Sequence, residues 1–230
     1  MIRFLLLDLD DTVLDFHKSE QLAIKKTLQE FGMEPTEAVC ALYSRINQAH
    51  WERLERKEIT RAEVLVGRFG VLMETLQVAG DAAACSRRYM ENLSQETHFL
   101  PGAFDALATL AETYELYAVS NGNLRVQEGR LAKANISQFF REIFISEALG
   151  ADKPSPEFFR HVFARIPDFT PQEAIIVGDS LTSDILGGKN AGIPTCWINP
   201  KHKPHPASLC PDYQIEALSQ LPDLLRHISV

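Results

Sequence analysis

Two acidic residues stand two positions apart, Asp8 and Asp10, directly after the apolar run at positions 4–7. In an extended segment such side chains leave on the same face, so both carboxylates point into one volume. Carboxylates this close repel each other unless a cation or a shared proton relieves them. Acids after a strand also shape turns and cap helices, so further groups are needed to indicate a site.

A second pair of acids follows a later apolar run, at positions 174–177. Asp179 closes that run, and Asp184 lies five residues further along, where the next helix is expected to begin. Asp184 alone fits an acid at a helix N-terminus, but an acid that ends a buried strand must be solvated by some partner. Carboxylates gathered at strand ends suit Mg²⁺, which binds few carboxylates, keeps waters and takes another contact from a phosphate.

Two other segments carry groups suited to phosphoryl oxygens. Ser120-Asn121-Gly122 ends a further apolar run and offers a hydroxyl and loop amides, as an oxyanion cradle requires. Lys153 is a candidate for a fixed positive charge. In isolation both features have ordinary explanations, because Ser, Asn and Gly are common in turns and most lysines are only solvated.

The elements that position these residues alternate between strands and helices. Five short apolar runs predict strands buried on both faces of a parallel sheet, at positions 2–7, 116–119, 143–145, 174–177 and 194–198. Helix-start signals lie between them, at Pro101-Gly102, at Ser155-Pro156 and, as a capping box before a single turn, at positions 170–173. We therefore predict an α/β fold with a doubly wound, Rossmann-like parallel sheet and a site at the carboxyl ends of its strands.

Positions 16–97 interrupt this alternation. Apolar residues recur there at helical spacing, and Thr60-Arg61-Ala62-Glu63 is a capping box that opens a helix. We expect two domains: an α/β core made of residues 1–15 and 98–230, and an all-helical cap made of residues 16–97. A cap inserted after the first strand lies over the strand ends, where a lid would sit.

Four motifs, in this order, resemble the signature of the haloacid-dehalogenase (HAD) superfamily: Asp-x-Asp-x-Thr at positions 8–12, Ser120 before Asn-Gly, Lys153-Pro154 before a helix, and Gly178-Asp179 followed by Asp184. The resemblance implies that Asp8 is a nucleophile that forms an aspartyl-phosphate and that Asp10 is the general acid and base. It also implies that Ser120 holds the phosphoryl oxygens and that Lys153 neutralises the nucleophile and the transferring group.

The same resemblance implies a magnesium site. The expected metal-site residues are Asp8, Asp10 through its backbone carbonyl, Asp179 and Asp184, and the expected cofactor is Mg²⁺. Dehalogenases of the superfamily lack an acid at the position of Asp10 and P-type ATPases carry Thr there, whereas phosphohydrolases and phosphomutases carry Asp. The chain therefore resembles the Mg²⁺-dependent phosphomonoesterases, with the mutases as a minor branch.

A closer likeness covers nearly the whole chain. Four segments carry it: 8–16, 120–131, 145–147 and 177–192. They are similar to the bacterial house-cleaning pyrimidine 5′-nucleotidases, which act on dUMP, UMP, dTMP and modified pyrimidine monophosphates. The likeness implies a 5′-nucleotidase whose partner is a small phosphorylated metabolite, a nucleoside monophosphate. The subfamily's usual Thr before Asn-Gly is Ser120 here, and its common Ala before Lys-Pro is Asp152, an added acid beside the lysine.

Substrate contacts are expected from Leu9 and Asn121 in the site loops, and from Phe16 and His17, which follow the catalytic loop directly. Specificity should come from the inner face of the cap, which closes over the site and excludes water. Four cap residues are candidates for stacking on a base, although core packing is the more common role of each: Tyr43, His50, Trp51 and Tyr89.

Three hypotheses for the function compete. The first is a Mg²⁺-dependent nucleotidase for pyrimidine monophosphates, and the second is a HAD phosphatase for another small metabolite, such as phosphoglycolate or a sugar phosphate. The third is a phospho-acceptor signalling module, since receiver domains also gather Asp, Ser or Thr and Lys around Mg²⁺. Receiver domains are shorter, lack a helical insertion and have no use for Asp10 as a proton shuttle.

The composition of the chain argues against several other classes of protein. The 230 residues, 45% of them hydrophobic, are enough for a self-sufficient core. A net charge of −8 argues against a nucleic-acid polymer or an anionic membrane as partner, because both require a basic surface. The N-terminal apolar run is too short for a signal peptide or a membrane span, so we expect a cytoplasmic protein. The four cysteines show no zinc spacing and are expected to be reduced.

Overall fold

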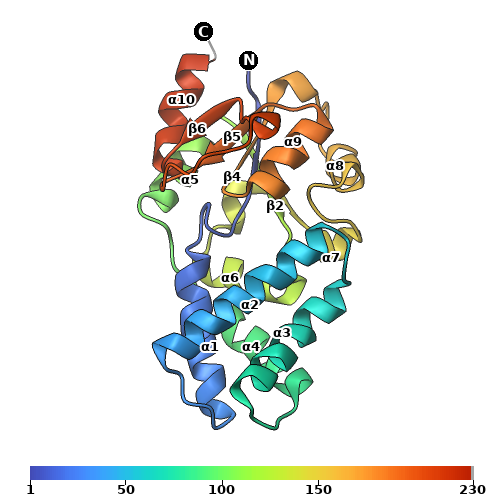
Figure 1. Cartoon of the computed structure of the whole chain (residues 1–230). Coiled ribbons are helices and arrows are strands. Elements are labelled where there is room, and N and C mark those ends of the chain that lie inside the picture. Colours follow the sequence, from blue (N-terminus) through green and yellow to red (C-terminus); the bar gives the residue numbers. More distant parts are fainter. Residues whose placement is uncertain (229–230) are drawn as a thin grey trace.

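A computed structural model describes residues 1–228 of the chain (Figure 1). Its centre is one six-stranded sheet in the order β3-β2-β1-β4-β5-β6, in which all neighbouring strands are parallel. The strands are β1 Phe4–Leu7, β2 Glu115–Ser120, β3 Phe140–Ile145, β4 Ala174–Gly178, β5 Thr195–Ile198 and β6 Tyr213–Ile215. The predicted α/β fold and its five strands are confirmed. The sixth strand, β6, lies outside the prediction because its three residues form no apolar run.

The strands are apolar throughout because helices cover both faces of the sheet. In β1, Leu5 and Leu7 face one hydrophobic cluster, and Phe4 and Leu6 face another on the opposite side. The helices of this α/β part are α5 Ala103–Ala111, α6 Leu124–Ala134, α7 Ser146–Leu149, α8 Pro156–Phe163, α9 Leu186–Ala191 and α10 Leu221–Ile228. Helices α5 and α10 cover the first face, and α8 covers the second.

Short turns complete the α/β part: four 3₁₀ turns at Ser137–Phe139, Pro171–Glu173, Ala207–Leu209 and Leu218–Gln220, and a π-helical turn at Leu181–Ile185. Gly102, with a φ of 70°, precedes α5, and Ser155 caps α8, so these two predicted helix starts are confirmed. The predicted capping box at positions 170–173 is wrong. The backbone N–H of Glu173 donates to the carbonyl of Thr170 at 2.9 Å instead of to its hydroxyl, as befits a single 3₁₀ turn.

Four consecutive helices, the helical insertion, lie between β1 and α5: α1 Phe16–Glu30, α2 Glu37–Glu55, α3 Arg61–Leu76 and α4 Ala82–Ser94. Each begins after a residue whose side-chain oxygen accepts a backbone N–H of the first turn: Asp15, Thr36, Thr60 and Asp81. The predicted capping box of Thr60 and Glu63 is confirmed. The four helices pack around a hydrophobic cluster of their own and lie beyond the carboxyl ends of the strands (Figure 1).

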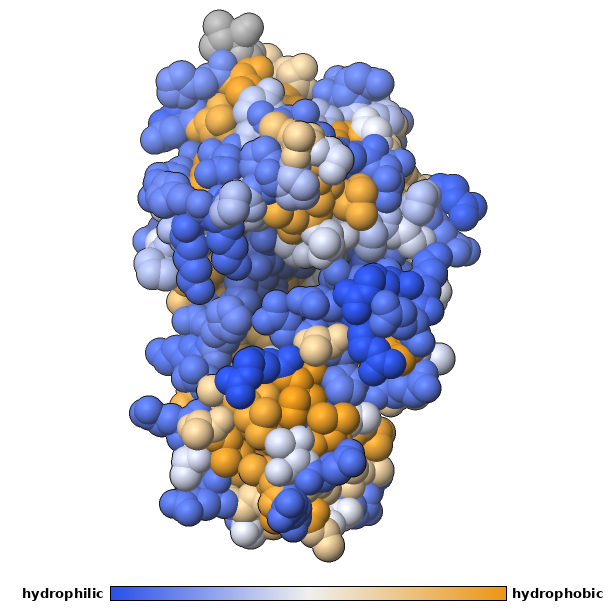
Figure 2. Space-filling view, in the orientation of Figure 1, coloured by the Kyte–Doolittle hydropathy of each residue, from blue (hydrophilic) through white to orange (hydrophobic). Residues whose placement is uncertain are grey.

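On the face that Figure 2 shows, the two parts of the molecule differ in surface hydropathy. Hydrophilic residues cover most of the visible α/β part, whereas hydrophobic residues gather on the visible face of the helical insertion (Figure 2). Exposed large hydrophobic side chains in the insertion include Leu22, Val66 and Val71.

No helix within residues 1–228 is long and apolar enough to cross a membrane. All four cysteines are free, and Cys40, Cys85 and Cys196 are buried.

Candidate active site

Three neighbouring strands end at one edge of the sheet and bring predicted site residues together there. Asp8 follows β1, Ser120 ends β2 and Asp179 follows β4, and β1 lies between the other two strands. Polar side chains at the carboxyl ends of adjacent parallel strands share one crevice. The structure therefore places these three residues in one location although the sequence separates them widely.

Lys153 joins this group from the loop between α7 and α8, and its side chain is only 1% exposed. Its ammonium donates to Asp8 Oδ1 at 2.7 Å, to Asp184 Oδ1 at 2.6 Å and to the carbonyl of Val119 at 2.7 Å. These acceptors use all three of its N–H groups. Burial opposes the charge, but the carboxylates of Asp184 and Asp8 outweigh it and raise the pKa of Lys153, so this side chain is a fixed cation.

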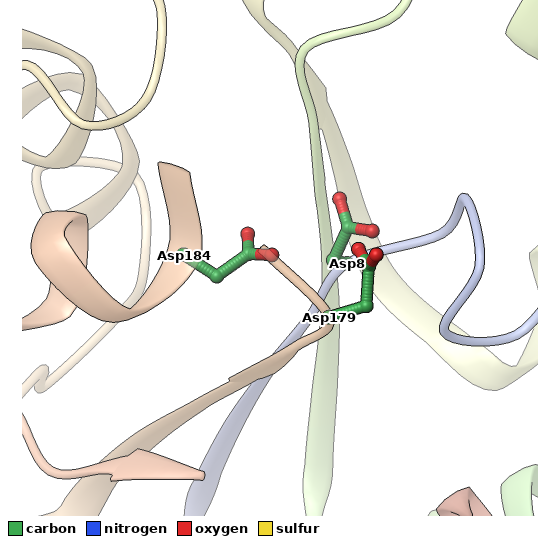
Figure 3. A group of neighbouring side chains, drawn as sticks. All are labelled: Asp8, Asp179 and Asp184. Carbon is green, nitrogen blue, oxygen red and sulfur yellow. The ribbon is translucent and has the colours of Figure 1, made fainter. Parts of the chain in front are cut away.

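Asp8, Asp179 and Asp184 form an acidic cluster (Figure 3). Each offers a carboxylate oxygen, and these atoms lie within 4.8 Å of one another. Figure 3 shows Asp8 and Asp179 side by side, with Asp184 pointing toward them from the other side. Three ionised carboxylates against the one ammonium of Lys153 leave a formal charge of −2, which a divalent cation would balance. The donor set of hard oxygen ligands therefore fits Mg²⁺.

The raised pKa values in the cluster reflect burial and the same crowding of negative charge. Burial raises the pKa of Asp8 to about 7, opposed by Lys153 and assisted by the charges of Asp184 and Asp10. Burial also raises the pKa of Asp179 well above its ordinary value, and the charges of Asp8 and Asp184 add to the effect. Carboxylates that cannot all ionise on their own become stable anions next to a bound cation.

Asp184 reaches the cluster by a close approach to the backbone. It lies in the π-helical turn after β4, and its Oδ2 accepts the backbone N–H of Ser180 at 3.1 Å. A Cβ atom at Gly178 would stand 2.1 Å from that same Oδ2, a separation that two nonbonded atoms cannot adopt. Glycine is therefore required immediately before Asp179.

The side chain of Asp10 is held by two residues of α6. Arg130 forms an ion pair with Asp10 Oδ1, and Gln127 Nε2 donates to Asp10 Oδ2 at 2.8 Å. Arg130 is almost wholly buried and also donates to Gln127 Oε1 at 3.0 Å. The Asp10 carboxylate is thus held in place at the cavity wall.

The hydroxyl of Ser120 is oriented by its neighbours. Its oxygen accepts two hydrogen bonds, from the backbone N–H of Gly122 at 3.1 Å and from Gln127 Nε2 at 2.8 Å. A hydroxyl has two acceptor positions and one proton, so the O–H of Ser120 remains available to donate. Because Ser120 lines the cavity, this proton can serve a phosphoryl oxygen there.

Asn121 uses its side chain to position the lysine loop. Its Nδ2 donates to the carbonyl of Lys153 at 2.8 Å, and its Oδ1 accepts the backbone N–H of Lys153 at 2.8 Å. Both polar groups of the side chain are therefore engaged within the protein. If Asn121 contacts the substrate, as predicted, the contact therefore has to come from its backbone.

Two side chains of the helical insertion reach the α/β part beside the site. Arg61, at the start of α3, forms an ion pair with Asp152 and donates to the carbonyl of Asn121 at 3.0 Å. Thr182 Oγ1 donates to Glu55 Oε2, on α2, at 2.8 Å. These contacts hold the insertion over the strand ends.

A cavity of about 220 Å³ extends from the acidic cluster to the helical insertion. Eight of the ten predicted site residues line it: Asp8, Asp10, Phe16, Ser120, Asn121, Lys153, Asp179 and Asp184. The insertion and α6 supply a largely apolar wall: Phe16, Trp51, Leu65, Met90, Leu93 and Val126. The cavity thus suits a ligand that carries a charged group at one end and a flat or apolar group at the other.

Two predicted substrate contacts lie outside this cavity. Leu9 is fully buried in the hydrophobic cluster beneath the sheet edge and does not line it. His17 is mostly exposed, lies 3.5 Å from Asp11, and lines a separate cavity. Phe16, in contrast, lines the cavity.

Of the four residues of the insertion that are candidates for stacking on a base, three are buried in the insertion and one lines the cavity. Tyr43 and Tyr89 are fully buried, with ring centroids 5.2 Å apart, and belong to the core of the insertion. His50 is buried and bonds to the carbonyl of Ile46 at 2.8 Å. Of these four, Trp51 is the residue that lines the cavity.

Several polar residues of the site carry no role in the sequence prediction: Arg61, Arg68, Gln127 and Arg130. Gln127 and Arg130 stand one helical turn apart after the Ser120 loop, and that spacing is a signal that both face the site. Arg68 interrupts the apolar stripe of α3 and is buried, which indicates a specific partner. Arg61 follows a helix cap, and no local pattern in the sequence indicates that it contacts Asp152.

The chain is similar to known proteins over most of its length. The family described as haloacid dehalogenase-like hydrolase matches residues 5–198. The pyrimidine 5′-nucleotidase PynA of Streptococcus pneumoniae is 38% identical over 224 residues, which cover 97% of this chain and 94% of that protein. The pyrimidine 5′-nucleotidase YjjG of Escherichia coli is 27% identical over 218 residues, 95% of each chain.

A solved structure is similar over nearly the whole chain. It is that of the HAD-hydrolase YfnB of Bacillus subtilis, which is 39% identical and superposes with a TM-score of 0.94, covering 97% of this chain and 98% of that one. The YfnB crystal structure is described as bound to magnesium and as revealing interdomain movement.

Proposed function

This chain belongs to the haloacid dehalogenase-like hydrolase family, and from this premise we propose that it is a Mg²⁺-dependent 5′-nucleotidase for pyrimidine nucleoside and deoxynucleoside monophosphates, including modified ones. It is a phosphoric monoester hydrolase. The names of PynA and YjjG support a nucleotide substrate. The magnesium described in YfnB and the acidic cluster support the metal.

One observation carries the substrate proposal: a single cavity joins the phosphoryl-binding groups to an aromatic and apolar wall. Phosphoglycolate or a small sugar phosphate would occupy the charged end and leave Phe16 and Trp51 without contact. A nucleotide places its phosphate at Lys153 and its base against that wall, so both ends of the cavity are used. For this arrangement we propose that residues 16–97 act as a cap domain on a core of residues 1–15 and 98–230.

The proposed reaction has two steps. In the first, the Asp8 carboxylate attacks phosphorus, the ester P–O bond breaks, and Asp10 gives its proton to the leaving alcohol. In the second, Asp10 takes a proton from water as that water attacks phosphorus, and the bond to Asp8 breaks to release inorganic phosphate. Asp10 needs a held position for both transfers, and the contacts with Arg130 and Gln127 supply it.

The remaining groups stabilise charge. Lys153 lies against Asp8 and carries a fixed positive charge beside the transferring group. Ser120 donates its free O–H to a phosphoryl oxygen. The residues that would hold the metal are Asp8, Asp179, Asp184 and the backbone carbonyl of Asp10. When bound, Mg²⁺ supplies positive charge that favours ionised Asp8 and neutralises the phosphoryl oxygens.

The test is phosphate release in the presence of Mg²⁺ from dUMP, dTMP, UMP, purine monophosphates, phosphoglycolate and sugar phosphates, with Asp8→Asn as the control. We expect selective hydrolysis of the pyrimidine monophosphates, which the Asp8→Asn variant loses. Phosphate release from a non-nucleotide ester alone would reject pyrimidine monophosphates as the substrate. A stable phosphoprotein with no release would favour a signalling module, and wild-type turnover by Asp8→Asn would reject the nucleophile.

A further inference from the structure

Arg68 is a buried cation in the middle of α3, with 3% of its surface exposed. Its Nη1 donates to Asn47 Oδ1 at 2.7 Å, and its Nε donates to the carbonyl of Leu65 at 3.3 Å. Asn47 in turn donates to Glu20 Oε1 at 2.7 Å, and Glu20 is also buried. The amide of Asn47 thus links the two buried charges, which lack direct contact.

Three aromatic rings hold the guanidinium in place. Its central carbon lies 4.9 Å from the ring centroid of Tyr89, 5.5 Å from that of Phe69 and 6.0 Å from that of Tyr43. Cations are attracted to the faces of aromatic rings at such distances. The position of Arg68 is therefore set by the core of the insertion and needs no ligand to order it.

One end of this guanidinium is unused. Within residues 1–228, Nη2 of Arg68 makes no hydrogen bond, although Nε and Nη1 both do. Nη2 is also not fully buried and retains some exposure. Because Arg68 lines the catalytic cavity and is otherwise enclosed, that exposure is toward the cavity. The cavity wall therefore presents a positioned, charged N–H donor.

We propose that Arg68 determines base specificity by donating a hydrogen bond to the 4-carbonyl oxygen of a uracil or thymine ring. The inference rests on the proposed nucleotidase function. With the phosphate held at Asp8 and Lys153, the 4-position is the ring position opposite the glycosidic nitrogen and extends furthest toward the insertion. Arg130, the other arginine of the cavity, is committed to Asp10 and Gln127.

The same contact discriminates against cytosine. Uracil and thymine carry a hydrogen-bond acceptor at the 4-position, whereas cytosine carries an amino group, which is a donor. Two donors cannot bond to each other, so a cytosine ring would leave the Nη2 donor of Arg68 unpaired in a desolvated cavity. Sites built to hydrogen-bond one substrate group reject an analogue that lacks it more strongly than apolar pockets do.

The experiment measures kcat/KM for dUMP, dCMP and 2-deoxyribose 5-phosphate, the last being the same phosphate ester without a base. The variants are Arg68→Met and Arg68→Lys, and the second keeps a positive charge opposite Glu20 if the first fails to fold. The matched control is Arg88→Met, which removes an arginine paired with Glu30 on the insertion outside the cavity.

We expect the wild type to prefer dUMP to dCMP, and Arg68→Met to lower kcat/KM for dUMP about 10- to 100-fold, the value of one charge-assisted hydrogen bond. Hydrolysis of the sugar phosphate should stay within about twofold in both Arg68 variants, since the lost bond involves only the base. The ratio of kcat/KM for dUMP to kcat/KM for dCMP should fall in both Arg68 variants and should persist in Arg88→Met.

The outcomes separate the two hypotheses. A wild type that hydrolyses 2-deoxyribose 5-phosphate as well as dUMP overturns the nucleotidase function and the role of Arg68 together. A wild type that prefers dUMP to the sugar phosphate, but whose ratio of dUMP to dCMP survives both Arg68 substitutions, overturns the role of Arg68 alone. Equal losses on dUMP and on the sugar phosphate also overturn it, because they indicate a structural defect.

Discussion

Arg61 of the helical insertion forms an ion pair with Asp152 of the α/β part, one residue before the buried Lys153. Their side chains are 17% and 34% exposed, so the pair is partly shielded from water. Arg61 also donates to Ser146 Oγ at 2.7 Å. The ion pair places the positive charge of Arg61 against the negative charge that Asp152 adds beside Lys153.

The pairing predicts that the two residues are coupled in catalysis. Arg61→Met leaves Asp152 unpaired near the phosphoryl site and removes a contact of the insertion, so we expect kcat/KM to fall about tenfold. Adding Asp152→Ala should restore part of that loss, because the unpaired acid is then gone. A double-mutant cycle on phosphate release from dUMP measures this coupling. Strictly additive losses in the double variant would contradict it.

The two proposed roles of Asp10 predict a trapped intermediate in Asp10→Asn. An amide cannot protonate a leaving alcohol or activate water, but an activated ester with a good leaving group needs no proton. We expect such an ester to phosphorylate Asp8 and the phosphoenzyme to accumulate, which intact-protein mass spectrometry detects. The Asp8→Asn/Asp10→Asn double variant is the control and should stay unmodified. Normal steady-state turnover by Asp10→Asn would show that another group moves the proton.

Much of this site could be predicted from the sequence because its acids sit in local patterns. Asp8 and Asp179 each follow an apolar run, and such runs form adjacent parallel strands whose carboxyl ends meet. The partners of these acids could not be predicted in this way. Arg130 and Asp10 are 120 positions apart, and no local pattern states which cation of the chain will lie against which acid.

His17 shows that residues next to each other in the sequence need not face the same site. It follows Phe16 directly, and both were expected to contact substrate. Helix α1 begins at Phe16, and successive residues on a helix point about 100° apart, so one faces the cavity while the other faces outward. Leu9 illustrates the same point in an extended segment, where it points to the face opposite Asp8 and Asp10 and packs in the core.

The acidic cluster predicts that Mg²⁺ stabilises the fold as well as supporting turnover. A cation that binds the native state alone raises the melting temperature in proportion to the logarithm of its concentration above Kd. Chelation should abolish phosphate release and lower the melting temperature, and added Mg²⁺ should restore both. Asp179→Asn should weaken both responses, whereas Asp105→Asn, on the first turn of α5, should keep them. Full activity after exhaustive chelation would contradict the metal role.

Glu30 on α1 and Arg88 on α4 join two helices of the insertion and predict a pH-dependent contribution to stability. Arg88 donates to both oxygens of Glu30 at 2.7 Å, and hydrogen bonds from Arg88 and Asn92 lower the pKa of Glu30 from 4.5 to about 2. A carboxyl whose pKa is depressed by folding contributes stability above its unfolded pKa, and that contribution is lost as pH falls toward its folded pKa.

Arg88→Met should therefore melt below the wild type at pH 7, and the difference should shrink as pH falls from 4.5 toward 2, the interval over which Glu30 in the wild type takes up its proton. High salt should also reduce the difference at pH 7, because both side chains are partly exposed, at 42% and 30%. Arg87→Met is the control, since Arg87 lies on the exposed face of the same helix. A melting difference that is the same at every pH would show that Arg88 acts through the packing of its alkyl chain and not through the charge of Glu30.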